Sequence, residues 1–314
     1  MSDKPVAEVI LTANLPAQIE QKIVSQFSTA KILLQDAGTD DFIQKMGRPT
    51  ALVVIPGDPI NARLISLLPE SIKLIASYSA GLDHVDIDAA RARNIEVSNT
   101  PDVLTDATAD IAILLILGAV RGAGNAASLI TNHAWKGWEP RQIFGYDLKN
   151  KTLGIMGPGR IGQATARRAS AFGLNLVYWG LQHVPAIEQL GAKPILDLKD
   201  FLGEADILSL HLPATNQTRN IINQKTLSMM KPGSFLINTA RGDLLDDDAV
   251  IEALASGHLA GIGLDVFSGE PNIHSGYLSS INTFLLPHIG SSTHETRQAM
   301  GDMVIASLQK MLRG

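Results

Sequence analysis

The stretch Thr152-Leu-Gly-Ile-Met-Gly-Pro-Gly-Arg-Ile-Gly162 decides how this chain folds. Its apolar start predicts a short strand, and a helix is expected from about Arg160 to Phe172. Between the two, Gly157, Gly159 and Gly162 have the spacing of a dinucleotide-binding turn, in the strand–turn–helix context that such a turn requires. The stretch therefore predicts one βα unit of a nucleotide-binding sheet.

Each glycine of this turn has a physical task. Gly157 permits a tight turn, Gly159 lets a pyrophosphate approach the backbone because it has no Cβ, and Gly162 lets the helix pack closely on the strand. The phosphates would lie on free N–H groups at the positive end of the helix. Incidental glycines in an ordinary turn are the alternative, and the flanking strand and helix argue against it.

The composition is that of a globular protein. The chain has 314 residues, enough for two domains, with 45% hydrophobic and 18% charged residues. Its 26 basic and 31 acidic side chains leave a formal charge of −5, which argues against a general nucleic-acid surface. Cysteine is absent, so disulfides, thiolate metal sites and cysteine nucleophiles are excluded.

No targeting or membrane segment is expected. The longest apolar run, 111–120, is far too short for a membrane span, and residues 1–5 contain no hydrophobic signal region. A cytoplasmic enzyme is therefore expected.

The first hundred residues alternate short apolar runs with helical patterns. The runs are continuous in their hydrophobicity, as buried parallel strands are. A small α/β domain is therefore expected, with strands at Ala7 to Leu11, Lys31 to Leu34, Ala51 to Ile55, Leu74 to Ser77 and Ile95 to Ser98.

Asn99-Thr-Pro101 marks a crossing between domains, because the residue before a proline is disfavoured in a helix. A helix from about Thr105 to Arg121 follows, and then the stretch 122–148, which is expected to be irregular. This stretch holds Trp135 and Trp138 and is too long and too aromatic for a plain linker. It either packs on the protein or reaches a partner.

From Lys151 onward the alternation resumes, and strands are expected at 152–156, 175–179, 206–210, 234–238, 260–264 and 283–286. The acidic run Asp246 to Asp248 opens a helix that Gly257 ends. The last helix begins with the capping-box pattern Ser292-Thr-His-Glu295 and carries apolar residues at helical spacing, so it should dock back on the first domain.

Three segments after late strands carry the chemical residues. They are Ile237-Asn-Thr-Ala-Arg-Gly242, Leu264-Asp-Val-Phe-Ser-Gly-Glu-Pro271 and Leu286-Pro-His-Ile-Gly-Ser-Ser-Thr293. Together with the glycine-rich turn and Leu104-Thr-Asp-Ala-Thr-Ala-Asp110, they resemble the D-2-hydroxyacid dehydrogenase family, and most of all its glyoxylate and hydroxypyruvate reductases. The resemblance extends from Ser79-Ala-Gly-Leu-Asp-His84 onward, with the motifs in the family's order.

The resemblance implies a fold. It predicts an α/β protein with two doubly wound parallel-sheet domains, in which a Rossmann nucleotide domain is inserted in a flavodoxin-like substrate domain. The substrate domain would comprise residues 1–100 and 287–314. The dinucleotide-binding domain would comprise residues 101–286, with a dimerisation arm near 122–148. A homodimer is the implied assembly.

The resemblance also implies roles that agree with the chemistry. Reduction of a 2-keto acid needs a cation for the carboxylate, a proton donor for the carbonyl oxygen and a hydride donor. Arg241 offers a permanent charge on a planar fork, and His288 a general acid in reduction and a general base in oxidation. Glu270 would bond the other ring nitrogen and stabilise the imidazolium. A surface arginine, a structural histidine and a turn carboxylate before Pro271 are the alternatives, and the surrounding motifs argue against them.

Binding residues follow from the same resemblance. The backbone of Ser79, Ala80 and Gly81 would bind the substrate carboxylate beside the catalytic arginine and histidine, and Trp138 of a neighbouring subunit would enter the substrate pocket. No metal is expected, because the remaining histidines lack metal-ligand spacing. The implied cofactor contacts are Thr105, Gly157, Gly159, Arg160, Ile161, Gly162, Gly180, Leu181, Gln182, His211, Leu212, Pro213, Thr218, Thr239, Ala240, Asp265 and Gly290.

Gly180 stands where NAD enzymes place an Asp or Glu on the ribose 2′-hydroxyl. Without a carboxylate a 2′-phosphate is not repelled, yet Leu181 occupies the place where NADP-using relatives often have arginine. Gln182 and His183 remain as neutral or partly charged substitutes. Use of both NADP and NAD is therefore expected, with a weak lean to NADP. Gly180→Asp is expected to weaken NADPH use and to spare or improve NADH use.

The sequence leaves three functions open. The first is reduction of glyoxylate and hydroxypyruvate to glycolate and D-glycerate by NAD(P)H, which we favour. The second is a dehydrogenase for another D-2-hydroxy acid such as D-lactate, which differs only in pocket volume. The third is a non-enzymatic dinucleotide-sensing corepressor, which would need an exposed peptide groove. Neither a nucleic acid nor a membrane is expected as a partner.

Overall fold

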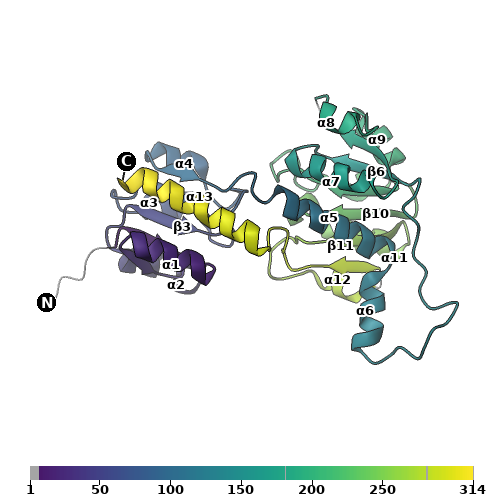
Figure 1. The fold of residues 1–314 in the computed structure, drawn as a ribbon, viewed down its shortest axis with the longest axis horizontal. Helices are drawn as coiled ribbons and strands as arrows, with labels where there is room; N and C mark the ends of the chain where they lie inside the picture. Colours follow the sequence, from purple (N-terminus) through teal and green to yellow (C-terminus); the bar gives the residue numbers. More distant parts are fainter. Residues whose placement is uncertain (1–6, 181, 281, 314) are drawn as a thin grey trace. The chain divides into compact units, whose positions relative to one another are not determined.

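The computed structural model describes residues 7–180, 182–280 and 282–313, and the chain divides into two compact units (Figure 1). One unit comprises Met1–Leu104 and Ser292–Gly314, and the other, Thr105–Ser291, is inserted between these two segments. The crossings therefore lie after Leu104 and before Ser292, a few residues later than the crossings expected at 100 and 287.

The first unit is a parallel sheet with helices on both faces. Its strand order, β2-β1-β3-β4-β5, is that of a flavodoxin-like sheet. Val9 and Leu11 pack toward α1 and α13, and Ile10 packs toward α2 and α3, because alternate residues of a strand face opposite layers. The strands are β1 (Val9–Leu11), β2 (Thr29–Lys31), β3 (Ala51–Val54), β4 (Leu74–Ser77) and β5 (Glu96–Ser98). The helices are α1 (Ala17–Gln26), α2 (Leu34–Met46), α3 (Ala62–Leu67), α4 (Ile87–Ala92) and α13 (His294–Arg313).

The last helix, α13, completes this unit, as expected from the sequence. Its buried Met300 and Leu308 lie in one hydrophobic cluster with Ile19 of α1. Gly301 allows the close approach of the two helices, because a Cβ there would stand 2.2 Å from the side chain of Ile19. The first domain is therefore built from both ends of the chain.

The second unit is a seven-stranded parallel sheet of order β12-β11-β10-β9-β6-β7-β8. This is the doubly wound Rossmann order, whose direction reverses between β6 and β9. The strands are β6 (Thr152–Met156), β7 (Asn175–Trp179), β8 (Lys193–Pro194), β9 (Ile207–Leu210), β10 (Ser234–Asn238), β11 (Leu259–Leu264) and β12 (Thr283–Leu285). One face carries α5 (Thr105–Val120), α7 (Arg160–Ser170) and α8 (Pro185–Glu188). The other carries α9 (Leu198–Glu204), α10 (Gln224–Leu227), α11 (Asp247–Ala255) and α12 (Ser275–Ser279).

Glycines bring α5 unusually close to this sheet. A Cβ on Gly118 of α5 would stand 2.1 Å from the ring of Phe284, and a Cβ on Gly263 of β11 would stand 2.8 Å from the carbonyl oxygen of Leu115. Both positions therefore need the smallest residue, and α5 lies in the core of the unit with Leu115 and Ile116 almost fully buried.

The structure corrects several expected elements. Strand β2 lies at Thr29–Lys31 rather than Lys31 to Leu34, because pairing with β1 decides its register. The short edge strand β8 was missed, and its proline is typical of an edge. The stretch 122–148 is not wholly irregular, since it contains helix α6 (Ala123–Thr131). The cap of α13 is the hydroxyl of Thr293, which accepts the N–H of Thr296 at 3.1 Å, rather than that of Ser292.

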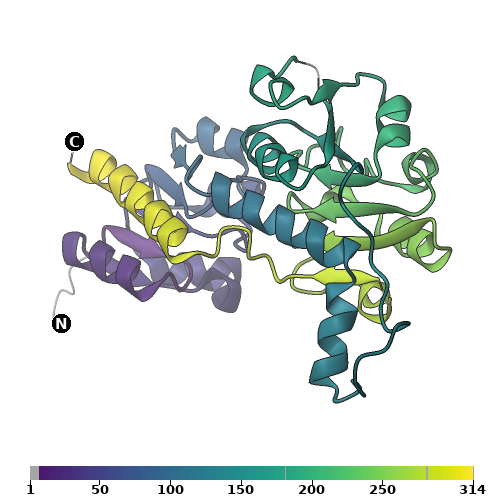
Figure 2. The ribbon, with the colours of Figure 1, turned by 45° about the vertical axis from the view of Figure 1, so that its right-hand side comes forward.

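Figure 2 shows α6 and the loop that follows it projecting from the second unit. Gly122, in the left-handed region with φ 63°, separates α6 from α5. Gly124 lets the new helix pass β12, because a Cβ there would stand 2.5 Å from the carbonyl oxygen of Thr283. Residues 122–148 are called the arm below.

Among the described residues, no single helix has the length and hydropathy of a membrane span, although α5 and α6 together pass that test across a 75° bend.

Candidate active site

The expected functional residues of the second unit gather at the carboxyl ends of its strands. Gly157 follows β6, Gly180 follows β7, and His211 follows β9. The segment 239–241 follows β10, and Asp265 follows β11 directly. Ligands of doubly wound sheets bind outside this edge, where the strand order reverses.

The glycine-rich turn has the shape of a phosphate cradle. Gly157 has φ 93°, in the left-handed region, and its N–H donates to the carbonyl oxygen of Trp179 at 3.2 Å. A Cβ on Gly162 would stand 2.5 Å from the carbonyl oxygen of Gly157, so α7 packs against the turn itself. In contrast, a Cβ on Gly159 would meet nothing within 4 Å. The turn is closed on its protein side and open at Gly159.

The start of α7 fits a pyrophosphate. Gly159 is its N-cap and supplies no side-chain cap to the first N–H groups. These N–H groups, of residues that include Arg160 and Ile161, are the positive end of the helix dipole. A negatively charged dinucleotide phosphate is therefore favoured at this end of the helix.

In α8, which follows β7, the structure shows a carboxylate that was not expected from the sequence. Glu188 of α8 accepts hydrogen bonds from the hydroxyl of Tyr178 and from the N–H of Val184, the latter at 3.1 Å. The hydroxyl of Tyr178 holds the pKa of Glu188 below its usual value. The Nδ1 of His183 lies 3.1 Å from the same carboxylate. Glu188 thus orients His183, while Leu181 lies outside the described residues.

Several buried side-chain atoms have no hydrogen-bond partner among the described residues, and two of them lie at the carboxyl ends of strands in this unit. These two are Nδ1 of His211 and Oγ1 of Thr239. The Nε2 of His211 lies 2.9 Å from Oγ of Ser209, and burial lowers the pKa of His211 to about 4, so its ring is neutral at pH 7. An unsatisfied buried polar atom is unfavourable, and these two stand at strand ends where a polar ligand group would satisfy them.

The remaining expected cofactor residues lie in several settings. Thr105 begins α5, and Leu212 touches the glycine-rich turn, where a Cβ on Gly157 would stand 2.8 Å from its Cδ2. The hydroxyl of Thr218 donates to the carbonyl oxygen of Pro213 at 2.7 Å. Thr218 therefore has a local role in shaping this loop.

His288 and Glu270 form a hydrogen-bonded pair. The Nδ1 of His288 lies 2.7 Å from Oε2 of Glu270, and the other carboxylate oxygen accepts the N–H of Phe267 at 2.8 Å. Burial acts to raise the pKa of Glu270, but the hydrogen bonds from His288 and Phe267 outweigh it and lower that pKa overall. Glu270 is therefore ionised at neutral pH and fixes one ring nitrogen of His288.

Asp265 holds the segment that carries His288. Its buried carboxylate accepts the N–H of Ile289 at 2.7 Å and the N–H of Gly290 at 2.8 Å, and its carbonyl oxygen accepts the N–H of His288 at 2.8 Å. His288 has φ 53°, a left-handed conformation that costs a non-glycine residue about 1–3 kcal/mol. Burial raises the pKa of Asp265, and the two backbone hydrogen bonds oppose that rise. Three hydrogen bonds therefore impose a conformation that the histidine would not adopt alone.

Arg241 is held beside this pair. The amide of Asn238 spans its turn, donating to the carbonyl oxygen of Arg241 at 2.8 Å and accepting the N–H of Ala240 at 2.9 Å. The charge of Arg241 contributes to the lowered pKa of Glu270. A Cβ on Gly242 would stand 1.9 Å from the carbonyl carbon of Phe267, so the loops after β10 and β11 are in direct contact. Asn238 was not expected from the sequence.

Ser79, Ala80 and Gly81 lie in the first unit, in the loop after β4. The hydroxyl of Ser79 donates to the carbonyl oxygen of Gly81 at 2.6 Å, and the amide of Asn99 donates to the carbonyl oxygen of Ala80 at 2.7 Å. In the part of the chain that the structure describes, the N–H groups of Ala80 and Gly81 donate to no other group. The carbonyl groups of the loop thus accept the hydrogen bonds that fix it, and its backbone N–H groups remain available to bind a carboxylate.

Trp138 lies in the arm, with 80% of its surface exposed. It does not belong to the cluster of Arg241, Glu270 and His288 within its own unit. No group of three or more metal-ligating side chains occurs among the described residues.

Known proteins are similar to this chain over most of its length. Residues 113–290 match the family described as D-isomer specific 2-hydroxyacid dehydrogenase, NAD binding domain. The chain is 43% identical over 277 residues to a glyoxylate reductase of Thermococcus litoralis, covering 87% of this chain and 83% of that protein. It is 41% identical to a glycerate dehydrogenase of Hyphomicrobium methylovorum, covering 83% of this chain and 82% of that protein.

A solved structure is also similar. It is an NADPH-dependent glyoxylate/hydroxypyruvate reductase of Sinorhizobium meliloti in complex with NADP and malonate. The TM-score is 0.85 at 33% identity, over 96% of this chain and 92% of that one.

Asp265→Asn is expected to loosen the segment of His288. An amide can accept only one of the two N–H groups and turns a donor toward the other, at a cost of about 1–3 kcal/mol for the unsatisfied group. The amide hydrogens of Ile289 and Gly290 should therefore exchange faster. Hydrogen exchange measures this, with the exposed Asp200→Asn as control, and unchanged protection at both amides would show that Asp265 does not hold the segment.

Proposed function

The chain belongs to the family of D-isomer specific 2-hydroxyacid dehydrogenases, and we propose that it reduces glyoxylate and hydroxypyruvate to glycolate and D-glycerate with NAD(P)H. The observation that carries the proposal is the 2.7 Å contact between Nδ1 of His288 and Glu270, in the same unit as the phosphate cradle. The relatives named above support the two substrates.

The two units have different proposed tasks. Thr105–Ser291 would hold the dinucleotide, and the unit formed by the two ends of the chain would hold the substrate carboxylate through Ala80 and Gly81. The cofactor is NAD or NADP, which supplies the hydride when bound. The cradle at Gly159 and the buried atoms of His211 and Thr239 are the features that fit it.

Arg241 and His288 would both act on the carbonyl oxygen of the keto acid. Arg241 would bind the substrate through its planar cation and stabilise negative charge on the carbonyl oxygen. His288 would donate its proton from Nε2 to that oxygen, because Nδ1 is engaged by Glu270. The ionised Glu270 stabilises the imidazolium before the transfer and orients the ring throughout. In the reverse direction the same nitrogen would accept the proton of the hydroxyl group.

The proposed function is tested by following NADPH or NADH absorbance with a panel of keto acids. Glyoxylate and hydroxypyruvate should be reduced with higher kcat/KM than pyruvate. A preference for pyruvate would make the chain a D-lactate dehydrogenase, and no turnover with any keto acid would contradict the proposal. The proposed compartment is the cytoplasm, where both cofactors are available.

Arg241→Ala is expected to raise KM for the keto acid and to lower kcat, because the charge acts on both the bound substrate and the transition state. The loss in kcat/KM should be at least ~2.7 kcal/mol, roughly a hundredfold. Arg241→Lys keeps the charge and loses the fork, so it should recover only part of this loss. A change below threefold in folded Arg241→Ala protein would remove the residue from the site.

Glu270→Gln is expected to move the pH profile of reduction. Glutamine can still contact Nδ1 but carries no charge, so the imidazolium loses its partner. Reduction needs the protonated ring, and its falling limb in kcat/KM should therefore move to lower pH. Profiles of this variant, of the wild type and of the exposed control Glu252→Gln make the comparison. An unmoved midpoint would show that Glu270 is not the functional partner of His288.

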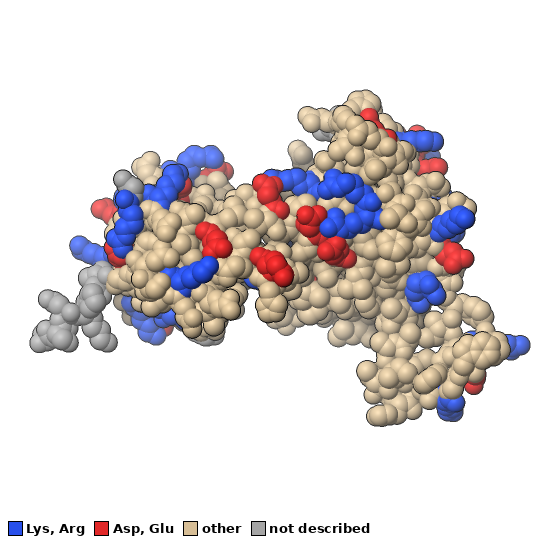
Figure 3. All heavy atoms as spheres, viewed as in Figure 1, with Lys and Arg blue, Asp and Glu red and all other residues tan. Residues whose placement is uncertain are grey.

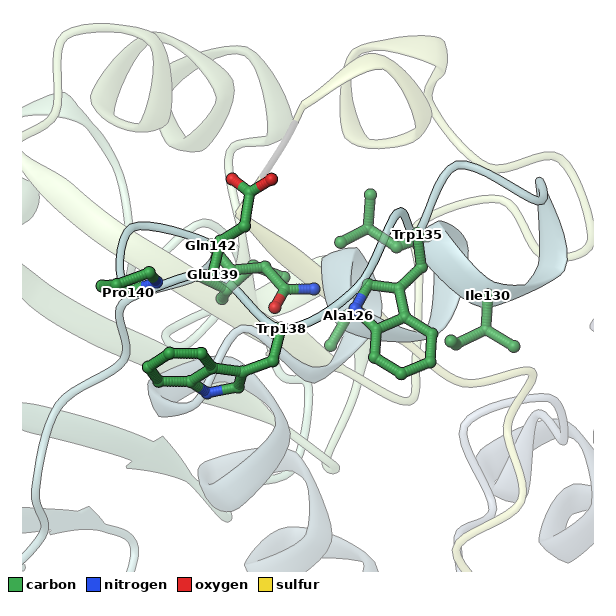
Figure 4. Close-up of a pocket in the computed structure, with 9 residues that line it drawn as sticks. Ala126, Ile130, Trp135, Trp138, Glu139, Pro140 and Gln142 are labelled. Atoms are coloured by element: carbon green, nitrogen blue, oxygen red, sulfur yellow. The ribbon is translucent and has the colours of Figure 1, made fainter.

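The arm supports a homodimer. Trp138 and Phe144 are 80% and 78% exposed, and Trp135 and Ile130 are more than half exposed. Figure 4 shows Trp135 and Trp138 on the loop beside α6, where they line a hollow of about 490 Å³. Figure 3 shows mostly uncharged atoms over the arm and charged side chains of both signs elsewhere on that face. Exposed aromatic surface of this kind is typical of a protein interface, and a second copy is the occupant we propose.

Trp138 would reach the substrate pocket of the second subunit. Trp138→Ala is then expected to change the ratio of kcat/KM for hydroxypyruvate and glyoxylate while the dimer stays nearly intact. Sedimentation velocity and the two kinetic constants test this together. A monomer at assay concentration would contradict the homodimer, and an unchanged ratio would leave Trp138 as an interface residue alone.

A further inference from the structure

Pro158, in the middle of the phosphate cradle, lies against Gly180 at the end of the neighbouring strand. A Cβ built on Gly180 would stand 2.9 Å from Cδ and 3.0 Å from Cγ of the proline ring. Non-bonded contacts shorter than 3.0 Å essentially never occur for Cβ atoms. Any side chain at this position therefore requires one of the two segments to move.

Position 180 requires glycine because of the space available there, and not because of its backbone conformation. Gly180 is not among the residues with positive φ, so an L-amino acid could adopt its backbone angles without strain. The proline ring is thus the obstacle to a side chain at this position.

The ring cannot give way by rotating. The Cδ of proline is bonded to its own backbone nitrogen, so the ring moves only when the backbone moves. That backbone is held on several sides: the side-chain amide of Gln163 donates to the carbonyl oxygen of Pro158 at 2.9 Å, and the N–H of Gly157 donates to Trp179 at 3.2 Å. A Cβ on Gly157 would also stand 3.0 Å from the carbonyl oxygen of His211. Displacing the ring therefore displaces the turn that leads into α7.

We propose that Pro158 is a cofactor-specificity residue, which excludes a carboxylate from position 180 and so keeps both NADP and NAD acceptable. This rests on the proposed function, because it assigns the end of β7 to the 2′ position of the bound ribose. A carboxylate there would repel a 2′-phosphate and accept a hydrogen bond from a 2′-hydroxyl. The choice of cofactor is therefore made by a pair of residues on neighbouring strand ends, and Gly180 is only one member.

The proposal predicts a different outcome for Gly180→Asp than the sequence did. Gly180→Asp alone would press on Pro158, shift the phosphate cradle and weaken both cofactors, rather than spare NADH. Pro158→Ala removes Cγ and Cδ, the two atoms in the way, and the single Pro158→Ala variant accounts for the backbone N–H that alanine adds. In that background the same aspartate has room, and its charge should act on the 2′ position alone.

A double-mutant cycle tests the coupling. The proteins are the wild type, Gly180→Asp, Pro158→Ala and the double variant, with Gly180→Asn in both backgrounds as the uncharged control of equal size. Dissociation constants for NADPH and NADH come from nicotinamide fluorescence, which needs no turnover. The midpoint of thermal unfolding without cofactor reports the steric contact by itself.

With Pro158 present, Gly180→Asp and Gly180→Asn should weaken both cofactors by at least tenfold and lower the unfolding midpoint. In the Pro158→Ala background, Gly180→Asp should weaken NADPH by more than tenfold and change NADH by less than threefold, while Gly180→Asn should affect both alike. Equal effects of Gly180→Asp in the two backgrounds, with NADH spared in each, would overturn the proposal. So would a wild type that binds neither cofactor.

The outcome is separable from that of the proposed function. A wild type that binds NADPH and NADH and shows the cycle as expected, but does not reduce glyoxylate or hydroxypyruvate, would contradict the substrate and leave the role of Pro158 intact.

Discussion

The carboxylate of Asp265 is the group on which the rest of the proposed site depends. It accepts two successive backbone N–H groups, and its carbonyl oxygen accepts a third, so a stretch of three residues is tied to one strand end. His288 stands in that stretch in a left-handed conformation, which the three hydrogen bonds impose. The proposed proton donor would have to keep its position during turnover, and this arrangement fixes His288 through the backbone rather than through the ring alone.

The neighbouring loops are built around the same point. Glu270 meets the ring of His288 from the loop after β11, and Gly242 brings the loop after β10 into direct contact with Phe267. Arg241 therefore stands close enough for its charge to lower the pKa of Glu270. A cation, a carboxylate and an imidazole are coupled electrostatically because parallel strands deliver all three loops to one edge. Each loop is fixed by backbone contacts, which tolerate little change in side-chain size at the contact.

The glycine-rich turn is enclosed by protein on one side and open on the other. Gly157 and Gly162 are enclosed by protein atoms, whereas Gly159 faces open space, so the cradle is rigid where it joins the sheet and accessible where a phosphate would bind. Pro158 stiffens the same turn and, through its ring, restricts the end of β7. The ring of Pro158 thus limits which side chain can occupy position 180, so the proposed contact of Gly180 with the ribose depends on the residue that shapes the phosphate turn.

The sequence by itself determined the alternation of strands and helices, the glycine-rich turn and the family, and it singled out Arg241, Glu270 and His288 as the residues of the proposed chemistry. These are local features: strand hydrophobicity, glycine spacing and short motifs are written in consecutive residues. Only the tertiary structure decided the register of β2 and the contact of Pro158 with Gly180. It also decided the hydrogen bond between Asp265 and Ile289, which lies 24 residues later in the chain. Helix α6 begins directly after Gly122 and contains Gly124, and the close approach of Gly124 to β12 exists only in the packed unit. The physical reason is the same in each case: hydrogen bonds and steric contacts between residues distant in the chain depend on distances that the packing of the sheet sets, and no local pattern encodes them.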